Sequence, residues 1–288
     1  MIDPKDVTII VPHLGQSREV SDLKQMEFAM DQCLISLHET VPQARIIVAK
    51  NGGQACGHAY GVELNIRSQG QNKAVNAAVA MTNTPWIFVT NDDMIYAPRW
   101  FEKLVAPMTE KTMCISPMLV EPRAGAPTFI VEFCGGAGGD FDKKKWLEFA
   151  NKHNAMNMDF NKITPGGLCR TGFNLPFLIS RELWNTIDGY DNEYDPWGSN
   201  GDSDLEYKIK LAGVQPYQNT NSIVYHFSNT SGTFAPENHS YWQKNWDYFI
   251  QKWGFPRTDD GIWEASFTIP TKEEGRIFTP EWEGKYVS

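Results

Sequence analysis

Residues 86–93 read Trp86-Ile87-Phe88-Val89-Thr90-Asn91-Asp92-Asp93, an apolar run that ends in a cluster of polar and acidic side chains. A run of this length is typical of a buried strand. Open α/β sheets bind their ligands at the carboxyl ends of the strands. The stretch therefore predicts a strand that places carboxylates at the ligand-binding edge of such a sheet.

Similar short apolar runs flank this stretch, separated by segments with helical spacing. We expect strands at 7–12, 46–49, 62–66 and 86–90. We expect helices over 22–40 and 72–81, with Pro98 at the first position of another. Strands that alternate with helices predict a mostly parallel sheet covered on both faces.

The second half of the chain has a different character. Short β-like runs occur within 113–134, and the glycine-rich segment 135–139 is either a lid or a plain connection. A strand at 177–179 and a helix over 181–187 follow a polar stretch at 140–168, which we interpret as a variable insertion. Over 236–253, four aromatic residues share one helical stripe, which predicts a helix docked on the main domain: Trp242, Trp246, Phe249 and Trp253.

A second acidic motif, Trp197-Gly198-Ser199-Asn200-Gly201-Asp202-Ser203-Asp204-Leu205, joins an aromatic-glycine loop to a predicted helix. Leu205, Ile209 and Ala212 form the apolar stripe of this helix, and Gly213 occupies the position of a C′ glycine. A carboxylate at the start of a helix behind a glycine loop is well placed to accept a proton from a bound hydroxyl. The alternative is that Asp202 and Asp204 only cap the helix and complement its dipole.

Together these segments resemble the GT-A fold glycosyltransferases, most closely family 2 of inverting nucleotide-sugar enzymes. The resemblance spans roughly residues 5–255. It rests on four segments that occur in the family's order, and His226 follows them. The segments are 7–12, 70–76, 91–93 and 197–205. Two positions depart from the family pattern. Asn91 replaces the first acid of the DxD metal motif, and Gly201 replaces the glutamate expected before Asp202.

The resemblance implies a GT-A (Rossmann-like nucleotide-diphospho-sugar transferase) fold, with a mixed, mostly parallel sheet, helices on both faces and a C-terminal helical extension. It implies a catalytic domain over 1–230, with a nucleotide-binding half at 1–110 and an acceptor-binding half at 111–230. Residues 231–288 would form a tryptophan-rich helical extension and a tail.

The resemblance also implies the roles of individual residues. Asp93 and His226 would bind Mn²⁺ or Mg²⁺, although a buried structural histidine is the alternative for His226. Asp202 would be the general base, with Asp204 as the substitute. The donor would contact Pro12, His13, Asn51, Lys73, Asn91 and Asp92, with a solvated lysine as the alternative for Lys73. The acceptor would contact Trp197, Gly198 and Asp204.

Composition narrows the functional classes. A formal net charge of −9 argues against binding to a nucleic-acid backbone, which needs clustered Lys and Arg. The five cysteines are scattered without a CxxC pair, so we expect them to be reduced thiols of a protein in a reducing compartment. No apolar run approaches 18 residues and no signal-peptide pattern is present, so we expect no transmembrane segment and a cytoplasmic protein.

The sequence thus predicts a metal-dependent inverting glycosyltransferase that uses a nucleotide sugar, with UDP the favoured carrier and a glycan or glycolipid precursor as acceptor. Two alternatives stay open. A sugar nucleotidyltransferase would carry a GxGxR loop after its first strand, where this chain has Pro12-His13-Leu14-Gly15-Gln16-Ser17. A non-catalytic carbohydrate-binding protein would accommodate Asn91 and Gly201.

Overall fold

The computed structural model describes residues 2–13, 20–51, 62–66, 70–122, 130–155, 175–196, 198–214, 216–228, 230 and 239–253. For 20–22, 51, 62–66 and 155 it describes the backbone alone. None of the helices within these ranges is long and apolar enough to cross a membrane.

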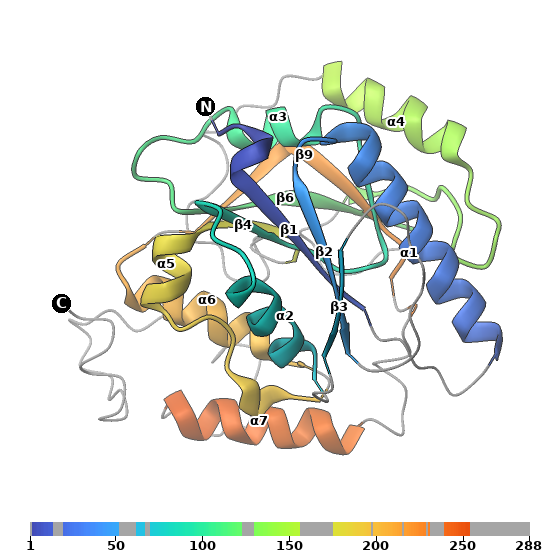
Figure 1. Ribbon diagram of the computed structural model, residues 1–288. Coiled ribbons are helices and arrows are strands. Elements are labelled where there is room, and N and C mark those ends of the chain that lie inside the picture. Colours follow the sequence, from blue (N-terminus) through green and yellow to red (C-terminus); the bar gives the residue numbers. More distant parts are fainter. Residues whose placement is uncertain are drawn as a thin grey trace.

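A nine-stranded mixed sheet forms the centre of the molecule, in the order β3-β2-β1-β4-β8-β6-β9-β5 with β7 paired to β6 (Figure 1). The strands are β1 (Val7–His13), β2 (Arg45–Asn51), β3 (Val62–Ile66), β4 (Trp86–Val89), β5 (Met94–Tyr96), β6 (Cys114–Glu121), β7 (Ile130–Val131), β8 (Phe177–Ser180) and β9 (Tyr217–His226). Strands β1 to β4 pair in parallel. Strand β8 runs antiparallel between β4 and β6, and β5 runs antiparallel to β9.

Helices cover both faces of this sheet, as Figure 1 shows. The helices of the described residues are η1 (Pro4–Asp6), α1 (Val20–Thr40), α2 (Gln71–Ala80), α3 (Trp100–Val105), α4 (Lys143–Ala155), α5 (Arg181–Thr186), η4 (Asn192–Tyr194), α6 (Gly201–Leu211) and α7 (His239–Trp253). Successive side chains of β1 point to opposite faces of the sheet, and each face carries its own hydrophobic core. Ile9 and Val11 pack in the cluster of α1, α3 and α4, whereas Ile10 packs in the cluster of α2, α5 and α6.

The strands expected from the apolar runs are confirmed, as are the helices at α1, α2, α5 and α6. The expectation for Pro98 was wrong. Helix α3 begins at Trp100, and Arg99 precedes it in the left-handed conformation as the N-cap. The glycine-rich segment 135–139 lies between β7 and α4. The amide of Gly136 donates to Asp140, the hydroxyl of Tyr225 in β9 donates to the carbonyl of Gly135, and Ala137 is buried.

Helix α7 docks on the main body through an aromatic cluster, as its stripe predicts. Trp246, Phe249 and Trp253 are buried against Tyr194 of η4 and Tyr207 of α6. Aromatic side chains bury large apolar areas, so this cluster contributes strongly to the association of α7 with α6. The C-terminal extension is therefore part of the folded unit in the described residues.

Candidate active site

The ends of β1 and β4 meet at the point where the strand order reverses. The chain continues from β1 to β2 on one side, while β4 lies on the other side of β1. His13 ends β1 and Asp92 follows β4, and Nδ1 of His13 lies 2.6 Å from Oδ2 of Asp92. Such a switch point is where open α/β sheets bind ligands, so two predicted donor residues meet there as a pair.

Strand pairing places Asp93 beside His226. Met94 in β5 is opposite His226 in β9, and the amide of Phe227 donates to the carbonyl of Asp93. The side chains also meet, with Nε2 of His226 3.4 Å from Oδ2 of Asp93. The hydroxyl of Thr230 donates to the same carboxylate oxygen at 3.0 Å. The structure thus brings together the two residues expected to bind a metal.

Glu121, the last residue of β6, holds the other side of the His226 ring. Its Oε1 lies 2.8 Å from Nδ1 of His226. Burial alone would lower the pKa of His226, but the Asp93 carboxylate and then Glu121 raise it to about 10. Burial likewise opposes ionisation of Asp93, yet the facing His226 and Thr230 keep its pKa below the ordinary value.

The resemblance to GT-A glycosyltransferases implies a divalent cation, and one observation tests whether these residues suit it. Oδ1 of Asp93 is buried and accepts no hydrogen bond from any described residue. A buried carboxylate oxygen without a partner is costly, and a cation would satisfy it. Within the described residues, no three or more His, Cys, Asp or Glu side chains are arranged so that they could together hold a metal ion. Asp93 and His226 therefore suit a metal that takes its other ligands from substrate phosphates and water, as Mg²⁺ commonly does.

The remaining predicted donor residues lie around the same edge. Pro12 is buried in β1 opposite Ala49, and Asn51 ends β2 opposite Ile66. Asn91 precedes the acidic pair and is partly buried, while its carbonyl accepts from the Thr90 hydroxyl. The side chain of Lys73 is exposed on α2.

A carboxylate from η4's C-cap occupies the N-terminus of α2. Oδ1 and Oδ2 of Asp195 accept from the amides of Asn72 and Lys73 at 2.9 and 3.0 Å. Gly70 makes this possible, because a Cβ there would lie 1.9 Å from the Asp195 carboxyl carbon. In this structure the positive end of α2 binds an internal carboxylate, and these two amides are already satisfied.

Asp202 lies in the first turn of α6, and a tyrosine holds its carboxylate. The hydroxyl of Tyr190 donates to Oδ1 of Asp202 at 2.7 Å. Burial raises the pKa of Asp202 to about 6, and the Tyr190 hydrogen bond opposes this shift. Asn76 of α2 fixes Tyr190 in turn by bonding both its amide and its carbonyl. A positioned carboxylate with this pKa suits general-base chemistry near neutral pH.

The loop before Asp202 packs against Asn72, which explains one departure from the family pattern. A Cβ at Gly201 would lie 2.9 Å from Nδ2 of Asn72, so a glutamate would not fit here without a shift. Gly198, with φ of +70°, approaches the same side chain. The helix cap is Asn200, so neither Asp202 nor Asp204 is the N-cap. Trp197 lies outside the described residues.

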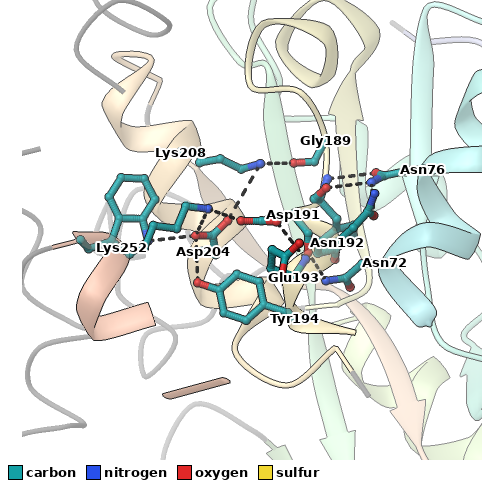
Figure 2. A network of polar contacts seen from close by, with 12 residues as sticks. Asn72, Asn76, Gly189, Asp191, Asn192, Glu193, Tyr194, Asp204, Lys208 and Lys252 are labelled. Atoms are coloured by element: carbon teal, nitrogen blue, oxygen red, sulfur yellow. Dashed lines mark hydrogen bonds and ion pairs between the residues drawn. The ribbon is translucent and has the colours of Figure 1, made fainter. Parts of the chain in front are cut away.

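Asp204 faces away from solvent into a charged network (Figure 2). Its Oδ1 lies 2.7 Å from Nζ of Lys252 and accepts from Tyr194 and from Trp253. Lys252 also contacts Asp191 at 2.6 Å. The carboxylate is fully buried, so it has no surface for an acceptor in this conformation. Its position assigns Asp204 to the attachment of α7 rather than to the acceptor site.

Four residues of the site escaped the sequence analysis: Glu121, Tyr190, Asp195 and Asn72. Glu121 had a detectable signal, because it ends the apolar run of β6 as Asp92 and Asp93 follow that of β4. The other three lie in loops or helix starts, and their roles depend on contacts across more than ten residues of chain.

One family model matches a segment of the chain. Residues 57–130 match the family model described as Glycosyl transferase family 2. No curated protein sequence matches the chain significantly.

Solved structures share the fold at low sequence identity. A crystal structure of GalNAc-T7 with UDP, GalNAc and Mn²⁺ is 15% identical with a TM-score of 0.51, and the match covers 76% of this chain but 42% of that one. The crystal structure of S. aureus TarS 1-349 is 11% identical with a TM-score of 0.51, and the match covers 88% of this chain and 74% of that one. The mannosyltransferase PcManGT from Pyrobaculum calidifontis, in complex with GDP-Man and Mn²⁺, is 11% identical with a TM-score of 0.53, covering 92% and 69%. The expected GT-A fold is confirmed.

Proposed function

We propose that this chain, which combines a GT-A glycosyltransferase fold with a family 2 segment, transfers a sugar from a nucleoside-diphosphate donor to a hydroxyl acceptor. One observation carries the proposal. Oδ1 of the buried Asp93 carboxylate has no hydrogen-bond partner among the described residues, while Oδ2 of the same carboxylate lies beside His226, which Glu121 contacts. Two structural neighbours hold Mn²⁺ with UDP or GDP-Man, which supports a nucleotide-sugar donor.

Asp93 and His226 would hold the cation, and the Glu121 carboxylate would keep the His226 ring in the orientation that presents Nε2. A bound Mn²⁺ or Mg²⁺ would offset the charge of the donor diphosphate and of the leaving group. His13 and Asp92 lie at the neighbouring switch point, where the nucleoside would bind. We favour UDP as the carrier.

Asp202 would act on the acceptor side. Its carboxylate accepts the proton of the acceptor hydroxyl as the oxygen forms a bond to the anomeric carbon. The bond from that carbon to the diphosphate oxygen breaks, and the nucleoside diphosphate leaves with the electron pair. Attack opposite to the leaving group inverts the anomeric configuration. Tyr190 would hold Asp202 for this step, and its hydrogen bond opposes the rise in the pKa of Asp202 that burial causes.

The acceptor would be a glycan or glycolipid precursor. A panel of nucleotide sugars, with and without Mn²⁺, tests the proposal and its alternatives. A glycosyltransferase should slowly release nucleoside diphosphate from one nucleotide sugar, and only with the metal. Pyrophosphate release from a nucleoside triphosphate and sugar phosphate would instead show a nucleotidyltransferase. Binding of sugar without any turnover would show a carbohydrate-binding protein.

A further inference from the structure

Helix α7 places one amide side chain against the loop that precedes the proposed base. Asn245 is almost fully buried, one turn before Phe249 of the aromatic cluster that docks this helix. Its Nδ2 donates to the carbonyl of Tyr194 at 2.7 Å. It also donates to the carbonyl and hydroxyl oxygens of Ser199, at 3.0 and 2.9 Å. All these contacts join α7 to the segment between η4 and α6, which we call the acceptor loop (residues 195–200) together with its flanking Tyr194.

Backbone hydrogen bonds connect this loop to the first turn of α6. The amide of Gly198 donates to the same Tyr194 carbonyl that Asn245 contacts, at 3.0 Å. The amide of Gly201 donates to the carbonyl of Gly198 at 2.8 Å, and α6 begins at this residue. Asp202 is the next residue along the chain. A shift of the acceptor loop would therefore displace the carboxylate of Asp202.

The contacts of Asn245 differ in kind from those that attach α7 to the main body. The attachment rests on the aromatic cluster around Phe249 and on Lys252, which pairs with Asp204. Asn245 is neither aromatic nor charged. An apolar side chain of similar size would suit a docking face, whereas a buried amide is costly unless it bonds other polar groups. The groups that satisfy this amide are the oxygens of the acceptor loop.

We infer that Asn245 is a positioning residue, whose amide fixes the acceptor loop and, through it, the carboxylate of Asp202. This inference rests on the proposed function and adds to it that the C-terminal helix takes part in the transfer step. Asp93 and His226, at the proposed donor site, lie on other elements. Loss of the Asn245 amide should therefore lower turnover and leave the affinity for the nucleotide sugar unchanged.

The experiment measures Mn²⁺-dependent hydrolysis of UDP-glucose, UDP-N-acetylglucosamine and GDP-mannose, in which water takes the place of the acceptor hydroxyl. Asn245→Leu has a similar volume but no donor. It should lower kcat by on the order of ten- to a hundredfold, the effect of misplacing a reacting group by about 1 Å, with KM for the nucleotide sugar unchanged. The matched control is Phe249→Leu, which loses buried aromatic area on the same face of α7. It should melt at a lower temperature but keep the wild-type kcat when assayed well below that temperature.

Ser199→Ala is a second variant, which removes one acceptor of the Asn245 amide from a half-buried side chain. It should lower kcat in the wild type at an unchanged melting temperature. It should have no further effect in Asn245→Leu, because the hydroxyl acts through the amide that this variant lacks.

A normal kcat in Asn245→Leu, or in Ser199→Ala if Asn245→Leu does not fold, would overturn the inference while leaving the proposed function intact. An equal fall of kcat in Phe249→Leu would also overturn it, because docking of α7 alone would then explain the effect. A raised KM with a normal kcat would place the action of Asn245 on the donor side and contradict the inference. Absence of hydrolysis of all three nucleotide sugars by the wild type would overturn both the inference and the proposed function.

Discussion

The hydroxyl of Tyr190 donates a 2.7 Å hydrogen bond to Oδ1 of Asp202, at the start of the helix that carries the proposed base. Because Asn76 of α2 fixes the backbone of Tyr190, this bond links the first turn of α6 to α2. The position and the acidity of Asp202 both depend on it.

The transfer rate of the wild-type protein should depend on the ionisation of Asp202. Burial raises the pKa of Asp202 to about 6, and only the ionised carboxylate can accept a proton. The rate should therefore rise with pH through about 6 and level off above it. Single-turnover rates from pH 5 to pH 8 with an identified donor and acceptor would show this. A rate that does not change across this range contradicts the assignment.

Asp202→Asn should lower transfer by on the order of 10²- to 10⁴-fold, the usual contribution of general-base catalysis. The amide keeps the shape but cannot accept the proton. Donor affinity and melting temperature should hardly change. Asp204→Asn is the matched comparison and should cost stability rather than chemistry, because Asp204 lies in the buried network with Lys252. Near-normal transfer in Asp202→Asn would remove the inverting-base mechanism.

Tyr190→Phe should shift the pH–rate profile to higher pH. The hydrogen bond from Tyr190 lowers the pKa of Asp202 against the effect of burial, so its removal raises that pKa. Activity near pH 6 should fall more than activity near pH 8. Tyr194→Phe is the control, because it removes the hydroxyl that contacts Asp204 instead. A shift in Tyr194→Phe but not in Tyr190→Phe would identify Asp204 as the base.

Glu121→Ala should weaken Mn²⁺ binding by on the order of 10- to 100-fold, the typical effect of removing a group that orients a metal ligand. Glu121 contacts Nδ1 of His226 and thereby fixes the ring. His226→Ala should also weaken the binding of Mn²⁺, but by less than Asp93→Ala does, because only Asp93 contributes a charge. Glu148→Ala, at an exposed position on α4, is the control. An Mn²⁺ titration unaffected in both Glu121→Ala and His226→Ala, with lower melting temperatures, would make His226 a buried structural histidine.

Lys252→Met should destabilise the fold by about 3 kcal/mol, because it removes the cation that joins Asp191 to the buried Asp204 and leaves Asp204 only the longer ion pair with Lys208. Urea unfolding would measure the loss. Lys244→Met is the matched control, since Lys244 is exposed on the same helix and should change stability little. Equal unfolding midpoints for the two variants would show that the network does not hold α7 in place.

Much of the fold follows from local patterns. Apolar runs such as 86–89 mark the buried strands, and the order of strands and helices implies a parallel arrangement. The antiparallel positions of β8 and β5 could not be predicted, because they depend on pairing between strands far apart in the chain. Helix α3 begins after Pro98 because Arg99 adopts the left-handed conformation as its N-cap. No sequence pattern indicates this conformation of Arg99.

The site shows the same division. The order of motifs placed Asp93 and His226 in one site, and the structure brings them together. Residues two apart on a helix do not share a face. The sequence alone could therefore have predicted that Asp202 and Asp204 point in different directions. Tyr190 and Asp195 could not be assigned in this way. Their importance comes from a contact across the fold.

Calorimetric titration of UDP with and without Mn²⁺, on the wild type and on Asp93→Ala, tests the central claim most directly. The wild type should bind UDP only with the metal. Asp93→Ala should lose that binding while keeping its melting temperature, because the diphosphate charge is no longer compensated. Normal Mn²⁺-dependent binding of UDP by Asp93→Ala would contradict the metal site and the function proposed from it.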